Sequence, residues 1–198
     1  MYPCFNESER FCEEPYAGKP HVRICEGRVS KGICLLDYRI FDMEIVHKRL
    51  TKSELGTFIN MRISQLTEEY EAEGREVPQN VNLKQALLDY YHRHMDDGTF
   101  VSWLAMDGGT IVGTSGISFV EKPPYFTCPS GKLGLLSSMF TDPAYRRMGI
   151  AKALLDRVVD EARIYGCGSV HITASDMGVK LYIAYGFQHN RNFMMYDL

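Results

Sequence analysis

The sequence is most informative where an apolar strand passes through a tight turn into an amphipathic helix. Residues 133–141 form the predicted strand, which Thr141-Asp142-Pro143 closes. From Ile150 onward, apolar residues recur at helical spacing, and Gly166 is a typical helix end. One face of this predicted helix consists of Leu154, Leu155, Val158, Val159, Ala162 and Tyr165. The turn between the two elements therefore contains the first backbone amides of a helix.

Those amides predict an anion site. The first N–H groups of a helix lack intrahelical acceptors and lie at the positive end of the helix dipole, so they suit a phosphate or pyrophosphate. Gly149 and Ala151 have side chains small enough for a ligand to approach the backbone. Two other phosphate loops are excluded, because the sequence has no G-x-x-x-x-G-K-[ST] and no G-x-G-x-x-G after a strand. We therefore expect a pyrophosphate on the turn from Arg146 to Lys152.

Two motifs in this part of the chain are similar to those of a known family. Arg146-x-x-Gly149-x-Ala151 resembles the R/Q-x-x-G-x-G/A signature of the GNAT superfamily of acyl-CoA N-acetyltransferases. The segment Leu181-Tyr182-Ile183-Ala184-Tyr185-Gly186-Phe187 resembles the L-Y-x-x-x-G-F helix end that follows the next strand in this family. Both motifs occur in the family's order, and the resemblance covers roughly residues 41–198.

The resemblance implies an α/β fold, with a mixed, mostly antiparallel, twisted sheet and helices on both faces. It also implies that acetyl-CoA is the co-substrate. The predicted contacts with acetyl-CoA are Met139, Phe140, Thr141, Arg146, Arg147, Met148, Gly149, Ile150, Ala151, Lys152 and Ser175. By the same resemblance, the Met139 amide would polarise the thioester carbonyl, and Tyr182 would return a proton to the leaving thiolate.

The expected reaction is direct attack of a neutral amine on the acetyl carbon, with both substrates bound together. No covalent acyl-enzyme is required, so Cys128 and Cys167 are interpreted as incidental thiols. The general base stays open between Glu121, His171 and a chain of water molecules.

Two positions depart from the family pattern. Ser175 stands where many members have asparagine, and Leu135 stands where histone-type members place a catalytic glutamate. Because of Ser175 and the unassigned base, the alternative hypothesis is a non-catalytic acyl-CoA sensor or interaction module. The acceptor is a small-molecule or peptide amine of unknown identity.

The other elements are predicted from local patterns. Thr51 to Glu54 is a capping box that follows a strand from Met43 and opens a helix, and a second helix runs from Leu83 to Asp97-Gly98. Strands Phe100–Met106 and Thr110–Glu121 are predicted to form a hairpin through a tight turn at Asp107-Gly108-Gly109. The remaining predicted elements are a short buried strand Ser169–Ala174, a helix Met177–Tyr185 and a final strand Phe193–Leu198. Residues 1–40 are interpreted as an extension of loops or a short hairpin, ahead of an N-acyltransferase domain at 41–198.

Composition excludes several other classes of protein. A net charge of −3 and an isoelectric point near 6.1 give no electrostatic footprint for nucleic acid. Neither a signal peptide nor an apolar run of about 20 residues is present, so we expect a cytoplasmic protein without a membrane partner. The cysteine spacing and the pair His92 and His94 predict no metal site. Members of the resembled family often pair, which allows a homodimer.

Overall fold

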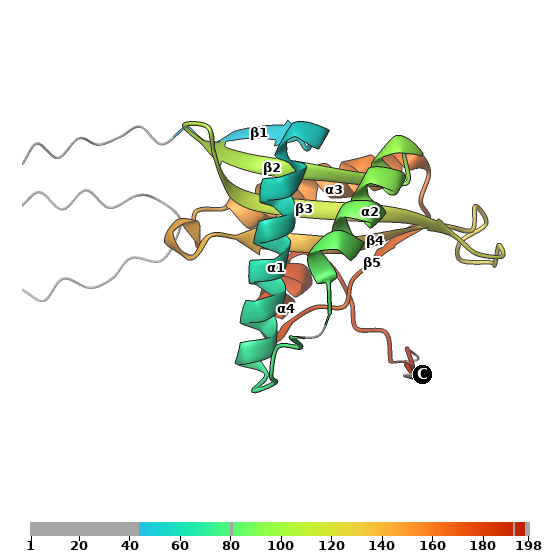
Figure 1. The fold of residues 1–198 in the computed structure, drawn as a ribbon. Helices are drawn as coiled ribbons and strands as arrows, with labels where there is room; N and C mark the ends of the chain where they lie inside the picture. The colour runs from blue at the N-terminus through green and yellow to red at the C-terminus, as the bar shows by residue number, and fades with distance from the viewer. Residues whose placement is uncertain (1–43, 80, 192, 197–198) are drawn as a thin grey trace, which may run out of the picture. The chain divides into compact units, whose positions relative to one another are not determined.

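The computed structural model describes residues 44–79, 81–191 and 193–196, and the elements below belong to the unit Asp42–Leu198 (Figure 1). In chain order they are β1 (Val46–Arg49), the 3-10 turn η1 (Lys52–Glu54), α1 (Leu55–Ala72), α2 (Leu83–Asp96), β2 (Phe100–Asp107), β3 (Thr110–Glu121), β4 (Lys132–Thr141), the 3-10 turn η2 (Pro143–Tyr145), α3 (Ile150–Tyr165), β5 (Ser169–His171) and α4 (Asp176–Tyr185). The predicted extension, residues 1–40, lies outside the described residues.

The strands form a single sheet in the order β1-β2-β3-β4-β5. All neighbouring pairs are antiparallel except β4 and β5, which are parallel. The tight turn predicted between β2 and β3 consists of Gly108 and Gly109, whose φ angles of 52° and 98° favour glycine. The predicted mixed, mostly antiparallel sheet is therefore confirmed.

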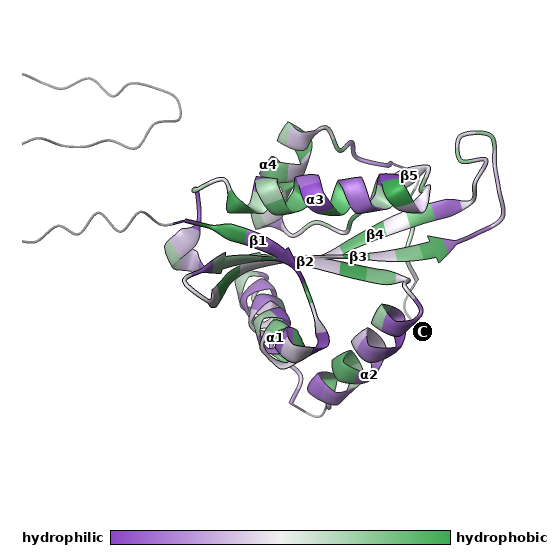
Figure 2. Ribbon diagram, turned by 90° about the horizontal axis from the view of Figure 1, so that it is seen from above, coloured by the Kyte–Doolittle hydropathy of each residue, from purple (hydrophilic) through white to green (hydrophobic). Residues whose placement is uncertain are grey.

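Helices cover both faces of this sheet, as predicted. Figure 2 shows α1 and α2 on one face and α3 and α4 on the other. The core under α1 and α2 contains Phe58, Tyr91, Phe100 and Leu104. The core under α3 and α4 contains Ile117, Leu136, Leu155, Val158 and Tyr182. Each helix presents one apolar face to the sheet, which explains the helical spacing of apolar residues in the sequence.

The predicted starts of the helical segments η1–α1 and α2 are confirmed, and each contains a capping hydrogen bond. In the predicted capping box, the Thr51 amide donates to Glu54 Oε2 at 3.1 Å, and η1 then leads directly into α1. The start of α2 is capped by Asn82, whose Oδ1 accepts from the Gln85 amide at 3.3 Å.

Two predicted strands differ from the structure. The strand predicted at Ser169–Ala174 is shorter and less buried, because β5 ends at His171 and its residues are half-buried or exposed. The final strand predicted at Phe193–Leu198 is wrong for residues 193–196, which form no strand and have side chains between 70% and 90% exposed. Strand-forming residue types need a cross-strand neighbour, and the described residues provide none for this segment.

Candidate functional site

The turn between β4 and α3 presents a run of backbone amides at the start of a helix. Asp142 Oδ1 accepts from the Ala144 amide at 2.9 Å and starts η2. Arg147 and Gly149 then adopt positive φ angles of 64° and 80°, and α3 starts immediately afterwards. In the described part of the chain, no recorded hydrogen bond is donated by the amides from Arg147 to Lys152. The turn is exposed, so these donors are open to an anion.

The cations at the two ends of this turn contact carboxylates of the protein. Arg146 Nη2 lies 2.7 Å from both carboxylate oxygens of Glu68 on α1, and Arg146 Nε donates to the Thr141 carbonyl at 3.1 Å. Lys152 Nζ lies 2.9 Å from Asp156 Oδ2. Between these two side chains, the main-chain amides and the exposed Arg147 side chain remain as possible anion donors.

One edge of β4 is open where the strand approaches this turn. β5 pairs with β4 only from Leu133 to Leu135, opposite Ser169 to His171. Beyond Leu135, the backbone of β4 has β3 on one side and no described strand on the other. Met139, Phe140 and Thr141, three of the predicted cofactor contacts, lie on this open stretch. An extended ligand has backbone donors and acceptors to pair with there.

A β-bulge interrupts β4 within this open stretch, at Ser138 and Met139. Gly116 pairs with Ser137 and Thr114 pairs with Phe140, which leaves Ser138 and Met139 together opposite Ser115. Ser138 has a φ of 53°, an unusual angle for a residue with a side chain. The Thr114 hydroxyl donates to the Ser138 carbonyl at 2.8 Å, and the Tyr91 and Ser138 hydroxyls lie 3.1 Å apart. The sequence contains no pattern that predicts this bulge.

Tyr182 is buried on the face of the sheet that α3 and α4 cover. Its side chain is 6% exposed and belongs to the core that contains Leu136. Burial and, to a smaller extent, the Glu69 carboxylate together raise the pKa of Tyr182 to about 12. The phenol is therefore neutral at physiological pH and is able to donate a hydrogen bond. Glu69 belongs to α1 on the opposite face, so groups from both faces act on each other here.

Glu69 is a carboxylate that the sequence analysis missed. Gln65, which is 8% exposed, donates through Nε2 to Glu69 Oε1 at 2.9 Å. Arg62 Nη1 in turn donates to Gln65 Oε1 at 2.9 Å. Within the described residues, Glu69 Oε2 has no recorded hydrogen bond. Contacts at i, i+3 and i, i+4 spacing thus orient one carboxylate oxygen and leave the other available.

The other candidate residues lie at different distances from the bulge. Glu121 pairs with Lys132 at the far end of β3, roughly 20 Å along the strand from Met139. His171 is exposed, lies opposite Leu135, and its Nε2 is 3.0 Å from the Ser169 hydroxyl. Ser175 is the N-cap residue of α4 and accepts from the amides of Gly178 and Val179 through its carbonyl. Position alone therefore disfavours Glu121 as a base.

Two absences hold within the ranges that the structure describes. No group of three or more His, Cys, Asp or Glu side chains in these ranges could hold a metal ion. No helix in the same ranges is long and apolar enough to cross a bilayer.

Comparison with known families adds the deciding observation. A sequence model of the acetyltransferase (GNAT) family matches residues 61–187, a span that contains the turn, the open edge of β4 and Tyr182. The chain belongs to the acetyltransferase (GNAT) family. This membership confirms the resemblance that two short motifs indicated.

Individual members of the GNAT family resemble the chain over part of its length. Glucosamine 6-phosphate N-acetyltransferase of Trypanosoma brucei brucei is 30% identical over 90 residues, which are 46% of this chain and 59% of the relative. The N-alpha-acetyltransferase RimI of Mycobacterium tuberculosis is 37% identical over 87 residues, which are 42% of this chain and 49% of the relative. The chain thus spans about half the length of these relatives.

A solved structure of a predicted acetyltransferase from Clostridium acetobutylicum with acetyl-CoA resembles the chain over most of its length. The two share 26% identity with a TM-score of 0.72, and the alignment covers 78% of this chain and 96% of the other. The arrangement of helices on both faces of the sheet is therefore that of a GNAT protein.

Proposed function

We propose that this chain transfers an acetyl group from acetyl-CoA to a primary amine. The observation on which the proposal depends is the run of amides from Arg147 to Lys152, which donate no recorded hydrogen bond among the described residues. A diphosphate is a suitable acceptor for such a run at a helix start. Family membership and the similar structure determined with acetyl-CoA support the choice of this diphosphate.

The geometry of the turn and of β4 supports the proposal that acetyl-CoA binds there. The turn amides would hold the pyrophosphate, and a Cβ added at Gly149 would meet no atom within 4 Å, so the space above this residue is open. The open edge of β4 from Met139 to Thr141 would pair with the pantetheine arm. This arrangement would bring the thioester to the bulge, where the Met139 amide would stabilise the developing oxyanion.

The proposed chemistry is a direct transfer. The neutral amine nitrogen attacks the acetyl carbonyl carbon, the C–S bond breaks, the nitrogen loses one proton and the sulfur gains one. We assign to Tyr182 a hydrogen bond to the leaving sulfur, because its raised pKa keeps the phenol protonated. Glu69 is the carboxylate that we assign to accept the amine proton. Holding both substrates together supplies much of the rate.

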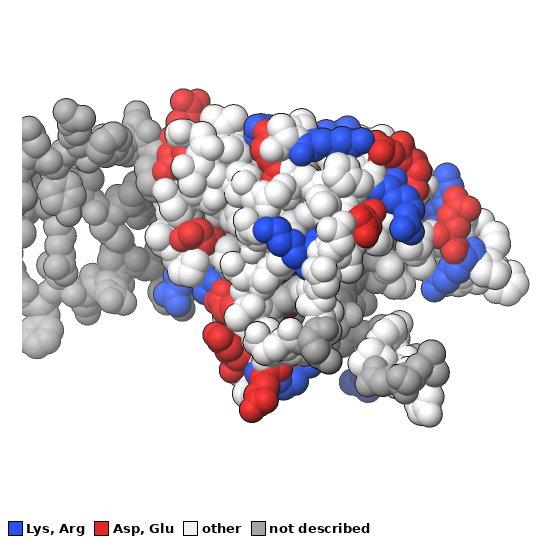
Figure 3. Space-filling view, in the orientation of Figure 1, with Lys and Arg blue, Asp and Glu red and all other residues white. Residues whose placement is uncertain are grey.

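The acceptor is proposed to be a cationic amine. Figure 3 shows Asp and Glu side chains gathered over the C-terminal end of α1, the end of the helix that contains Glu68 and Glu69. A local excess of negative charge raises the concentration of cations near it. A protonated amine that reaches Glu69 can then lose its proton before attack.

The test is release of CoA thiol from acetyl-CoA across a panel of primary amines. The panel would contain a polyamine, an aminoglycoside, an amino sugar phosphate and a peptide with a free N-terminus. We expect turnover with at least one amine and a loss of about tenfold or more in Tyr182→Phe. Tight binding of acetyl-CoA without turnover, and no effect of Tyr182→Phe, would instead support the sensor hypothesis.

A further inference from the structure

The side chain of Arg146 connects the turn between β4 and α3 to α1. Its guanidinium contacts Glu68 through both carboxylate oxygens and the Thr141 carbonyl through Nε. The same guanidinium lies 6.0 Å from the centroid of the Phe140 ring. All of these contacts are made with α1 or with the end of β4.

The turn has few other attachments to the domain. The Arg146 amide donates to the Pro143 carbonyl at 3.4 Å, whereas the amides from Arg147 to Lys152 donate no recorded hydrogen bond among the described residues. Residues 146–149 are exposed. The other recorded ties lie just before it, where Asp142 caps η2 and the Tyr145 hydroxyl donates to Asp107 Oδ2 at 2.8 Å. Arg147 has a positive φ, which is strained for a residue with a side chain and persists only if its surroundings hold it.

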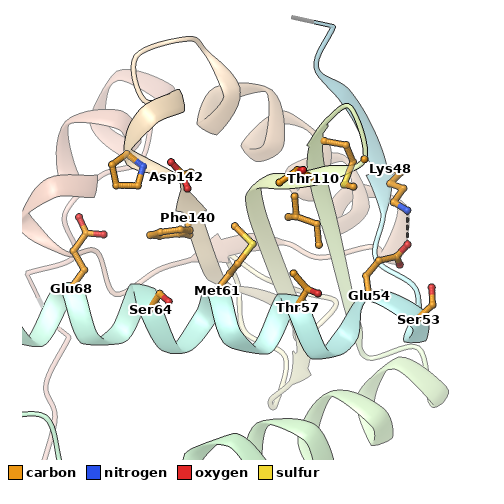
Figure 4. A pocket seen from close by; sticks show the side chains of 14 residues that line it. Lys48, Ser53, Glu54, Thr57, Met61, Ser64, Glu68, Thr110, Phe140 and Asp142 are labelled. Atoms are coloured by element: carbon orange, nitrogen blue, oxygen red, sulfur yellow. Dashed lines mark hydrogen bonds and ion pairs between the residues drawn. The ribbon is translucent and has the colours of Figure 1, made fainter.

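Glu68 is well placed to provide that support. It lines a groove of about 650 Å³ between α1 and the sheet, and Figure 4 shows it on α1 opposite Phe140 and Asp142. Its side chain is 33% exposed and that of Arg146 is 37% exposed, so water reaches the ion pair only in part. A partly shielded pair with two short contacts constrains geometry more than an open surface pair does.

We propose that Glu68 is a positioning residue for acetyl-CoA, because it holds Arg146 against α1 and thereby fixes the amides that receive the pyrophosphate. This inference rests on the proposed function. Simple electrostatics predicts the opposite effect of Glu68. A carboxylate near a diphosphate site repels the ligand, and its removal would also free Arg146 to bind phosphate. The sign of the effect on affinity therefore separates the two explanations.

The experiment is calorimetric titration of the full chain with acetyl-CoA. We expect Glu68→Gln to weaken binding about three- to tenfold, which corresponds to the loss of one charge-assisted contact. Glu71→Gln is the matched control, because it removes the same charge from the same helix at an exposed side chain that has no recorded side-chain contact with the described residues. We expect this control to change affinity less than about twofold, in line with a remote, screened surface charge.

A double-mutant cycle completes the test. Once Arg146→Gln is present, adding Glu68→Gln should have little further effect, since both changes remove one interaction. The charge swap Glu68→Arg with Arg146→Glu should recover part of the affinity. Unchanged or tighter binding by Glu68→Gln would overturn the positioning role alone. Absence of acetyl-CoA binding to the unmodified chain would reject both this role and the proposed function. Circular dichroism and thermal melting would confirm that each variant is folded.

Discussion

At the scale of single residues, alanine substitutions of two glycines at opposite ends of α3 distinguish an effect on ligand binding from an effect of backbone strain. Gly149 and Gly166 have φ angles of 80° and 84°, and a Cβ added at either would meet no atom within 4 Å. Gly149→Ala and Gly166→Ala should therefore each lower the free energy of unfolding by about 1 kcal/mol through strain alone. Chemical denaturation would measure this loss.

Only Gly149→Ala should weaken acetyl-CoA binding, and we expect a decrease in affinity of about tenfold or more. The added methyl group would occupy the open space that a pyrophosphate needs in order to approach the amides. Calorimetric titration of both variants would check this. Equal affinities in the two variants would show that the diphosphate does not lie over Gly149.

At the scale of elements, the bulge in β4 depends on a hydroxyl from the neighbouring strand. Thr114 is 1% exposed and donates to the Ser138 carbonyl at 2.8 Å. Thr114→Val keeps the shape of the side chain and leaves that carbonyl without this donor, which should cost about 1–3 kcal/mol of stability. Because Met139 lies next in the bulge, we also expect kcat to fall more than the KM for acetyl-CoA rises.

Thr110→Val provides the control for this prediction. Thr110 is exposed at the start of the same strand, and no side-chain hydrogen bond is recorded for it among the described residues. Its replacement should change the free energy of unfolding by less than about 0.5 kcal/mol. Similar losses in both variants would show that the effect of Thr114→Val comes from strand propensity and not from the bulge.

Local patterns predicted the elements whose causes are local. The capping box at Thr51, the two-glycine turn at Gly108 and the helix end at Gly166 each depend on residues only a few positions apart. The bulge at Ser138 depends on pairing with β3, and the tie from Arg146 to Glu68 joins residues that are 78 positions apart. Such contacts have no periodicity to detect in one sequence, so the motifs located the turn but not what holds it.

The final predicted strand failed for a related reason. Phe193 and Tyr196 are typical strand residues, yet a strand forms only beside another strand. The described residues show none beside them, and composition cannot supply that information. The same limit applies to Glu69, which acts on the pKa of Tyr182 although α1 and α4 lie on opposite faces of the sheet.

At the scale of the whole molecule, one buried carboxylate connects α3 to the edge strand β1 and to its neighbour β2. Glu161 on α3 is 6% exposed and accepts from Arg49 Nε on β1 and from Trp103 Nε1 on β2, each at 2.9 Å. The helix α3, which starts after the turn at Gly149, is thereby tied to the edge of the sheet farthest from β5. The two partners differ in exposure: the side chain of Arg49 is 56% exposed, whereas that of Glu161 is buried.

This difference in exposure predicts unequal effects on stability. Arg49→Met leaves the Glu161 carboxylate buried without its cation and should lower the free energy of unfolding by about 3 kcal/mol. Glu161→Met leaves Arg49 in contact with water and removes an acceptor from Trp103, so we expect a smaller loss of about 1–2 kcal/mol. The control is Arg163→Met, which breaks an exposed ion pair with Asp160 on the same helix and should cost less than about 0.5 kcal/mol. Urea denaturation of the four proteins would measure these differences. A loss in Glu161→Met that exceeds the loss in Arg49→Met would contradict the view that desolvation of the carboxylate dominates this interaction.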